Sequence, residues 1–289
     1  MNSNEWPLVF FTVLSQISLG VIFAAFVLSF TMRNSADPAL ESLKKLVIIA
    51  SLGTMGVALI ISFLHLANPL HAVYAISNTG SSWLSREILL AMMYFFTLLV
   101  CFTSIKYNLP HSSMFGYFFL ASLFVGTMMV WSMAQVYMIP TVPLWNSPAT
   151  PVAFFNTAIM LGSGLLLVIL TSYHIRISAL PDIKQFQTAL FYLVAASAFI
   201  YLLNTLLLQP DVTAAAGGFR APAIPMFWGL AQKVLMIVGF GLLVYWYTTQ
   251  TAIAISGKHW MLFFAVALLL LAELAGRYVF YASYYRVGI

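Results

Sequence analysis

Five ionisable side chains lie within long apolar runs of the sequence: His65, Glu87, Lys233, Glu273 and Arg277. Such groups are costly inside the hydrocarbon of a membrane, so each is a candidate for function if these runs are membrane-spanning. A histidine titrates near neutral pH, and a carboxylate at the same depth can accept or relay a proton. We therefore expect this set of residues to handle protons.

The composition indicates an integral membrane protein. Of the 289 residues, 62% are hydrophobic and only 7% are charged, whereas soluble domains are about 25% charged. A soluble protein of this composition would expose larger apolar patches than monomers tolerate. The net charge of +5 does not indicate nucleic-acid binding, because the longest basic run is the pair Lys44–Lys45. The single cysteine, Cys101, cannot form an internal disulfide, a zinc site or an iron–sulfur cluster.

Eight apolar runs reach the length of about 20 residues that a spanning helix needs. The stretch MNSNEWPLVFF lacks the basic region of a signal peptide, so we expect the first run to be a retained helix. The prediction is an all-α integral membrane protein, a single domain over residues 1–289. Its eight transmembrane helices are expected at 8–31, 45–67, 86–105, 113–137, 152–173, 186–208, 227–250 and 259–282.

Lysines and arginines predict the orientation of this bundle, because they are enriched in cytoplasmic connections. The odd-numbered connections contain seven of them: Arg33, Lys44, Lys45, Lys106, Arg176, Lys184 and Lys258. The even-numbered connections and the two tails contain three: Arg86, Arg220 and Arg286. We therefore expect both termini on the non-cytoplasmic side.

In this orientation the ionisable residues share one depth. His65 falls in the last turn of the second expected helix and Glu87 in the first turn of the third. Lys233 lies about two turns inside the seventh, and the pair Glu273 and Arg277 lies in the outer half of the eighth. All five are predicted in the outer leaflet. Thr12 and Gln16 add two polar side chains to one face of the first helix at a similar depth.

Each of these residues also has a purely structural interpretation. Glu87 follows Ser85, a possible N-cap, and a carboxylate in a first turn is stabilised by the helix dipole. Glu273 and Arg277 are spaced i, i+4 and could form an ion pair with each other. Lys233 could extend its amine to the interface. His65 could cap the end of its helix.

A histidine and a carboxylate at the edge of the hydrocarbon suit the oxidation of a quinol. The quinol site must open to lipid while the released protons leave to water. A haem is not expected, because every histidine other than His65 falls in a connection or at the edge of an expected helix. Electrons would then pass to a docked partner, for which the long outer connections 68–85, 138–151 and 209–225 offer a surface.

Several stretches of the sequence resemble the membrane-anchor subunit of bacterial dimethyl sulfoxide reductase. They are NEWPLVFFTVLSQISLG near the start, FLHLANPLHAVYAISNTGSSWLSREI over 63–88, TVPLW in the fourth connection, and AELAGRYVFYASYYRVGI near the end. This resemblance covers nearly the whole chain, and the motifs EWPL, HLANPLHA and LSREI are its most specific parts.

The resemblance implies eight helices with both termini in the periplasm, in the bacterial inner (cytoplasmic) membrane. It implies that the protein anchors an iron–sulfur subunit and a molybdopterin catalytic subunit and oxidises menaquinol. The histidine of the HL motif and the glutamate of the SxE motif, here His65 and Glu87, are tied to quinol oxidation in that family. The terminal electron acceptor is bound by another subunit.

The resulting prediction is a menaquinol-oxidising anchor in which His65 and Glu87 take up and pass on protons. Arg86, Gln16, Thr12, Arg277 and Glu273 complete the expected quinol-binding set. No haem, cluster or metal is expected in this protein. Two alternatives remain at this point. One is a quinone-interacting anchor of the polysulfide reductase type. The other is a proton-coupled secondary transporter, which would need ionisable residues near the midplane.

Overall fold

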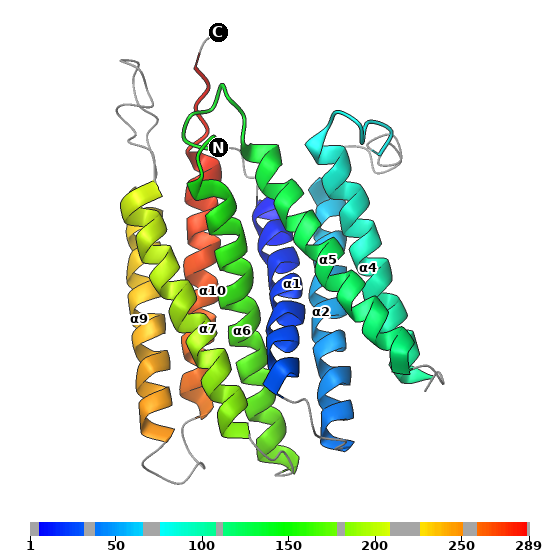
Figure 1. Cartoon of the computed structure of the whole chain (residues 1–289). Helices are drawn as coiled ribbons and strands as arrows, with labels where there is room; N and C mark the ends of the chain where they lie inside the picture. The colour runs from blue at the N-terminus through cyan, green and yellow to red at the C-terminus, as the bar shows by residue number, and fades with distance from the viewer. Residues whose placement is uncertain are drawn as a thin grey trace.

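The computed structural model describes residues 6–31, 38–65, 76–107, 112–177, 183–208, 226–250 and 259–287. Within these ranges the regular structure is entirely helical (Figure 1). The elements are α1 (Trp6–Thr31), α2 (Pro38–His65), α4 (Trp83–Lys106), α5 (Ser112–Tyr137), α6 (Ala149–Ile177), α7 (Ile183–Leu203), the π-helical segment η3 (Asn204–Leu208), α9 (Met226–Gln250) and α10 (His259–Ala282).

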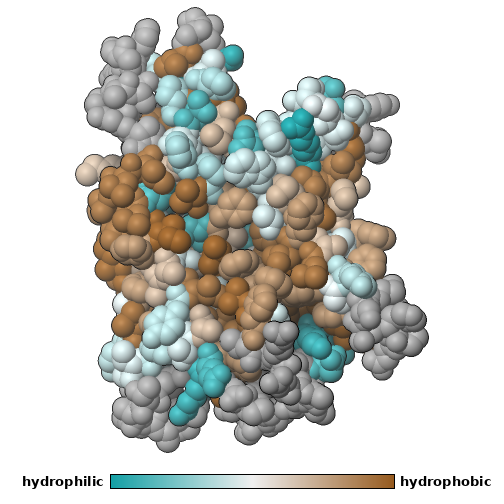
Figure 2. Space-filling view, in the orientation of Figure 1, coloured by the Kyte–Doolittle hydropathy of each residue, from teal (hydrophilic) through white to brown (hydrophobic). Residues whose placement is uncertain are grey.

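The described residues contain eight helices long and apolar enough to cross a membrane, which confirms the predicted number. The shortest of these spans has 23 residues, or about 35 Å at 1.5 Å per residue, against a hydrocarbon thickness of about 30 Å. Hydrophobic side chains form a brown band around the middle of the molecule, with paler and teal residues above and below it (Figure 2). The protein is therefore a multi-pass membrane protein.

Several helix boundaries differ from the prediction. α2 begins at Pro38 rather than residue 45, because proline is favoured in a first helical turn, where its missing N–H is no loss. α4 begins at Trp83 rather than residue 86, since Ser82 is the N-cap and accepts a hydrogen bond from the Ser85 amide at 3.3 Å. The run expected as one helix over 186–208 ends in the π-helical turns of η3.

The spanning helices in the described ranges form two groups of four that meet along α1 and α6. One group contains α1, α2, α4 and α5, and the other contains α6, α7, α9 and α10 (Figure 1). In the apolar windows of α1 and α6, 72% and 61% of the residues are buried, compared with 17% in α9. The seam between α1 and α6 is thus the centre of the molecule, and α9 lies at its edge.

Two glycines allow the central helices to touch at their backbones. A Cβ atom at Gly20 of α1 would overlap the carbonyl oxygen of Ala158 on α6. A Cβ atom at Gly162 of α6 would overlap the backbone of Gly20. In a membrane, where no hydrophobic effect drives helices together, such small residues permit the close van der Waals packing that holds them.

A buried hydroxyl cluster joins three helices of the first group. The hydroxyl oxygens of Ser18 on α1 and Ser51 on α2 lie 2.8 Å apart, and each lies 3.1 Å from the phenolic oxygen of Tyr94 on α4. All three residues are fully buried. Their mutual hydrogen bonds satisfy polar groups that would otherwise be costly in this environment.

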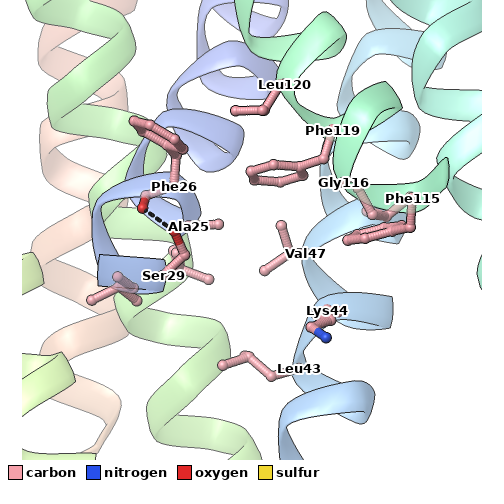
Figure 3. A pocket seen from close by; sticks show the side chains of 13 residues that line it. Ala25, Phe26, Ser29, Leu43, Lys44, Val47, Phe115, Gly116, Phe119 and Leu120 are labelled. Carbon is pink, nitrogen blue, oxygen red and sulfur yellow. Dashed lines mark hydrogen bonds between the residues drawn. The ribbon is translucent and has the colours of Figure 1, made fainter. Parts of the chain in front are cut away.

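An apolar cavity of about 330 Å³ lies between α1, α2 and α5, toward the end of the bundle where α1 finishes (Figure 3). Its Ser29 hydroxyl donates to the Phe26 carbonyl at 2.6 Å. Lys44 is paired with Glu41. The polar groups of this lining are therefore already satisfied by residues of their own helices.

The glycine contact predicts that Gly162→Ala will destabilise the protein, because the added methyl group must push α6 away from α1. We expect a lower unfolding temperature in detergent and less protein in membranes. The matched control is Gly241→Ala on α9, where a Cβ atom would meet nothing within 4 Å. Equal unfolding temperatures for the two variants would contradict the importance of this contact.

Candidate functional site

Arg277 is the centre of a buried polar network near one end of the bundle. Its side chain is only 5% exposed. The guanidinium donates to Oε1 of Gln16 at 3.0 Å, which joins α10 to α1. It also lies 3.8 Å from the ring centroid of Phe154 on α6, a cation–π contact. The positive charge of Arg277, which is costly in hydrocarbon, is thus stabilised by groups from two other helices.

Glu273 and Arg277 do not form the direct ion pair that their spacing allowed. Among the described residues the only such pair within 4.0 Å is Lys44–Glu41, on the surface of α2. Instead, the Thr157 hydroxyl of α6 donates to Oε2 of Glu273 at 2.6 Å and lies 3.5 Å from a guanidinium nitrogen of Arg277. The correction follows from packing, because α6 places Thr157 between the two charges.

A pair of tyrosines extends this network toward the first group of helices. The Tyr281 hydroxyl lies 3.1 Å from the hydroxyl of Tyr137 on α5 and 3.3 Å from that of Thr12 on α1. Tyr137 is enclosed by aromatic rings, among them Trp145 at 5.3 Å and Phe280 at 5.4 Å between centroids. The hydroxyls therefore form a line across α1, α5 and α10 inside an apolar shell.

Glu87 is buried beside this line, and its side chain is 4% exposed. No hydrogen bond or ion pair connects its carboxylate to another residue in the described ranges. It lies close enough to Tyr137 and Tyr281 for an electrostatic interaction with both hydroxyl groups.

The structure also removes the capping explanation of Glu87. Because α4 begins at Trp83 after the Ser82 cap, Glu87 lies in the second turn, and no acidic residue occupies the first. The dipole effect is confined largely to the terminal turn of a helix. A favourable interaction with the helix dipole therefore does not explain the position of the Glu87 carboxylate.

Arg86, the neighbour of Glu87, lies apart from the network. Its Nε donates to the Thr79 carbonyl at 2.7 Å and its Nη2 to the Gly80 carbonyl at 2.6 Å. Its guanidinium stacks on Trp83 at 4.3 Å from the ring centroid. In this structure Arg86 holds the turn that precedes α4.

His65 and Lys233 complete the predicted set. α2 ends at His65, which the prediction placed in the last turn of this helix. The side chain of His65 is outside the described part of the structure. Lys233 lies two turns inside α9 and is exposed. Its side chain lines a polar cavity that Glu273 and Arg277 border as well.

Three residues of the predicted quinol-binding set lie at similar depths in their helices. Thr12 and Glu87 lie in the first third of α1 and α4, and Arg277 lies in the last third of α10. At 1.5 Å per residue these three positions are about 6–9 Å inside the helix ends. Figure 1 shows that these helix ends are at the same end of the molecule.

The connection 138–148 closes this end over the tyrosine pair. The indole nitrogen of Trp145 donates to the Phe280 carbonyl at 2.8 Å. The Val287 amide donates to the Thr141 carbonyl at 2.9 Å. This connection is thus held by hydrogen bonds to α10 and to the residues that follow it. Of the other two long connections, residues 66–75 and 209–225 are outside the described part of the structure.

Sequence reasoning did not identify Tyr137, Thr157 or Tyr281 as members of the site. A signal for Tyr281 was present, because residues 273, 277 and 281 are spaced four apart and share one helix face. Tyr137 and Thr157 had no such signal, since the residues that they contact lie on other helices. Among the described residues, no group of three or more His, Cys, Asp or Glu side chains could hold a metal ion.

Comparison with known proteins places this chain in one family of membrane anchors. Residues 1–283 match the family model described as DMSO reductase anchor subunit (DmsC), so the chain belongs to the DMSO reductase anchor subunit family.

Similar curated proteins have related names. Anaerobic dimethyl sulfoxide reductase chain YnfH of Escherichia coli K12 is 28% identical over 291 residues, covering 99% of this chain and 97% of the relative. A subunit of the anaerobic dimethyl sulfoxide reductase of Haemophilus influenzae is 30% identical over 196 residues, covering 66% and 68%. A subunit of the anaerobic dimethyl sulfoxide reductase of Escherichia coli K12 is 27% identical over 305 residues, covering 99% and 97%.

We predict that Arg277→Met will lower stability, because it removes the hydrogen bond to Gln16 and the contact with Phe154 and leaves Glu273 without a nearby positive charge. The expected loss is about 2 kcal/mol or more, from typical values for charged hydrogen bonds and desolvated cation–π contacts. Denaturation in mixed micelles measures it. Lys184→Met, at an exposed position of α7, is the control and should have little effect. An equally stable Arg277→Met protein would contradict the network.

Proposed function

We propose that this protein is the subunit of a dimethyl sulfoxide reductase-type molybdoenzyme that binds and oxidises menaquinol. In this proposal it passes the electrons to an iron–sulfur subunit, which reduces a molybdopterin catalytic subunit in turn. Membership of the anchor family supports its role in such a complex. The observation that carries the quinol chemistry is Glu87, a buried carboxylate with no described partner, located near the end of the bundle where α2 finishes at His65.

Quinol oxidation requires groups that take protons from both hydroxyls of the ring. His65 would accept a hydrogen bond from one quinol oxygen and take its proton. Glu87, which has no described residue to neutralise it, would accept a proton and pass it toward the aqueous side. Its position about 6 Å inside the end of α4 is within reach of both the hydrocarbon, where quinols dissolve, and water.

The remaining predicted residues would support this site from the network. Thr12 and Gln16 lie on the face of α1 that meets Tyr281 and Arg277. Arg277 supplies positive charge near the tyrosine pair, and Glu273 balances it through Thr157. Arg86 would act indirectly, by holding the turn before α4.

Electrons would leave to a partner, because one cysteine cannot ligate a cluster. The iron–sulfur subunit would dock on the face formed by the 138–148 connection and the turn before α4. This face is close to Glu87 and is closed by ordered backbone. The bias of lysines and arginines supports a periplasmic location for this face and for both termini, in the inner membrane.

Two findings weigh against the alternatives. The family match supports the dimethyl sulfoxide reductase type of anchor over the polysulfide reductase type. The buried charged residues in the described ranges, Glu87, Glu273 and Arg277, all lie in the same half of the bundle. A proton-coupled transporter would need such groups near the midplane and on paths to both faces.

We expect His65→Ala and Glu87→Gln each to abolish quinol-dependent reduction while the complex still assembles in the membrane, because each removes a proton acceptor. The assay follows oxidation of a menaquinol analogue by membranes, with artificial electron donors to the catalytic subunit as a check on assembly. Glu41→Gln, an exposed glutamate at the opposite end, is the matched control. Normal quinol oxidation by either site variant would exclude that residue from the mechanism.

Fusion proteins test the orientation. Alkaline phosphatase is active only outside the cytoplasm, so we expect activity when it follows Ile289 and none when it is inserted between α6 and α7. The reverse pattern would place the Glu87 end of the bundle in the cytoplasm and contradict periplasmic docking.

A further inference from the structure

A polar cavity of about 420 Å³ lies in the second group of helices, between α6, α7, α9 and α10. None of its lining residues comes from α1, α2, α4 or α5, so it is separate from Glu87. In contrast to the apolar cavity of Figure 3, it is bordered by hydrogen-bonding side chains. Those that matter here are Asn156, Asn204, Lys233, Glu273 and Arg277.

Two amide oxygens in this lining are buried without a hydrogen-bond donor. They are Oδ1 of Asn156 on α6 and Oδ1 of Asn204 on η3, and the two residues are 4% and 5% exposed. Buried polar atoms are nearly always paired, so two unpaired acceptors at one cavity indicate that something with O–H or N–H groups occupies it.

The π-helical turns of η3 have a role in this arrangement. Asn204 is the first residue of η3, and its Nδ2 donates to the Ala149 carbonyl at 3.3 Å, where α6 begins. This bond leaves the amide oxygen as the free atom. π-helical turns inside longer helices are rare and frequently occur at functional sites.

The cavity reaches the lipid-facing surface beside α9. Lys233 lines it and is also exposed, about 10 Å inside the start of α9 at 1.5 Å per residue. Over α7 and α9, at the left of Figure 2, teal residues are visible within the brown band. The opening is therefore at the level of the hydrocarbon, where a lipid-soluble molecule would enter from the side.

Charges of both signs face the cavity. Glu273 is bound by Thr157, and its charge also acts on Tyr201 of α7. Arg277 is directed toward Gln16 and Phe154. Lys233 forms no hydrogen bond or ion pair with another described residue, so its ammonium group is available as a donor.

We propose that this cavity is a second pocket for the ring of a lipid-soluble quinol or quinone. The quinol hydroxyls would donate to Asn204 and Asn156, and Lys233 would donate to a quinone carbonyl. The volume is within the range of about 300–1,000 Å³ that small-molecule pockets have. Phe280 and Tyr201 add aromatic rings to the lining. The ligand class rests on the proposed function. The pocket shares Glu273 and Arg277 with the network that supports the oxidation site, but it has no lining residue from α2 or α4, the helices of His65 and Glu87.

The position of the cavity favours a quinol over a phospholipid headgroup. Glu273 lies about 14 Å inside the end of α10 at 1.5 Å per residue, which is below the level of the headgroups. A headgroup would have to leave the interface to reach the unpaired amide oxygens. A quinol ring already resides in the hydrocarbon and brings the hydroxyl donors that these oxygens lack.

Photo-crosslinking of the intact complex in nanodiscs tests the proposal. A naphthoquinone with a short photoreactive tail should label peptides of α7, α9 or α10. Lys233→Met combined with Asn204→Leu should reduce this labelling about tenfold, the effect of losing one to two hydrogen bonds. Lys106→Met, at an exposed lysine of α4, should leave it unchanged. Lys233→Arg with Asn204 intact should preserve most of the labelling, which separates loss of binding from misfolding.

The Glu87→Gln complex separates this proposal from the proposed function. Cavity labelling that persists while quinol oxidation is lost supports two distinct sites. Labelling confined to α2 and α4 would overturn the second pocket and leave the oxidation site standing. Labelling removed by excess phosphatidylethanolamine would make the cavity a lipid site, and no labelling of any helix would leave it filled by water. Each of these last two results would overturn the proposal.

Discussion

The contact between Gly20 of α1 and Gly162 of α6 determines how closely the two central helices approach, and the candidate site depends on that approach. Gln16 precedes Gly20 by four residues and Thr157 precedes Gly162 by five, so both lie within about a turn and a half of the crossing. If α1 and α6 were separated by the width of two ordinary side chains, Gln16 and Thr157 could not both reach the guanidinium of Arg277. The backbone contact at the seam therefore makes the buried charge on α10 tolerable.

This arrangement places charge only where several helices meet. Arg277 is stabilised by groups of α1 and α6, and the tyrosine pair is stabilised by α1, α5 and α10. Glu87 is the exception, because no described residue compensates its buried carboxylate. In a membrane protein such an uncompensated group carries a continuing cost to stability, and functional sites are where such costs are usually found. The proposed role of Glu87 as a proton acceptor gives that cost a reason.

Much of the fold could be predicted from the sequence, and the candidate site only in part. The length of an apolar run and the position of an ionisable residue along it can be read directly from the sequence. The number of helices and the similar depths of Glu87 and Arg277 could therefore be predicted. The start of α4 was misplaced by three residues, because the cap at Ser82 competes with a plausible one at Ser85. The pairing of Glu273 with Arg277 was allowed by spacing, but α6 inserts Thr157 between them. The spacing of residues along one helix does not show which residues of another helix they will contact.

By itself the sequence predicted a membrane protein with eight spanning helices, and the described part of the chain contains that number. It also determined the family, because the motifs that carry the resemblance are contiguous stretches of the chain. Only the tertiary structure decided how each helix is rotated about its long axis, and so which side chains face its neighbours. Helices that are apolar on every side carry no amphipathic stripe to orient them. The direction in which Arg277, Tyr281 and Asn204 point is therefore set by neighbours such as the Gly20–Gly162 contact. The separation of Glu87 from the cavity near Glu273 is a consequence of that packing.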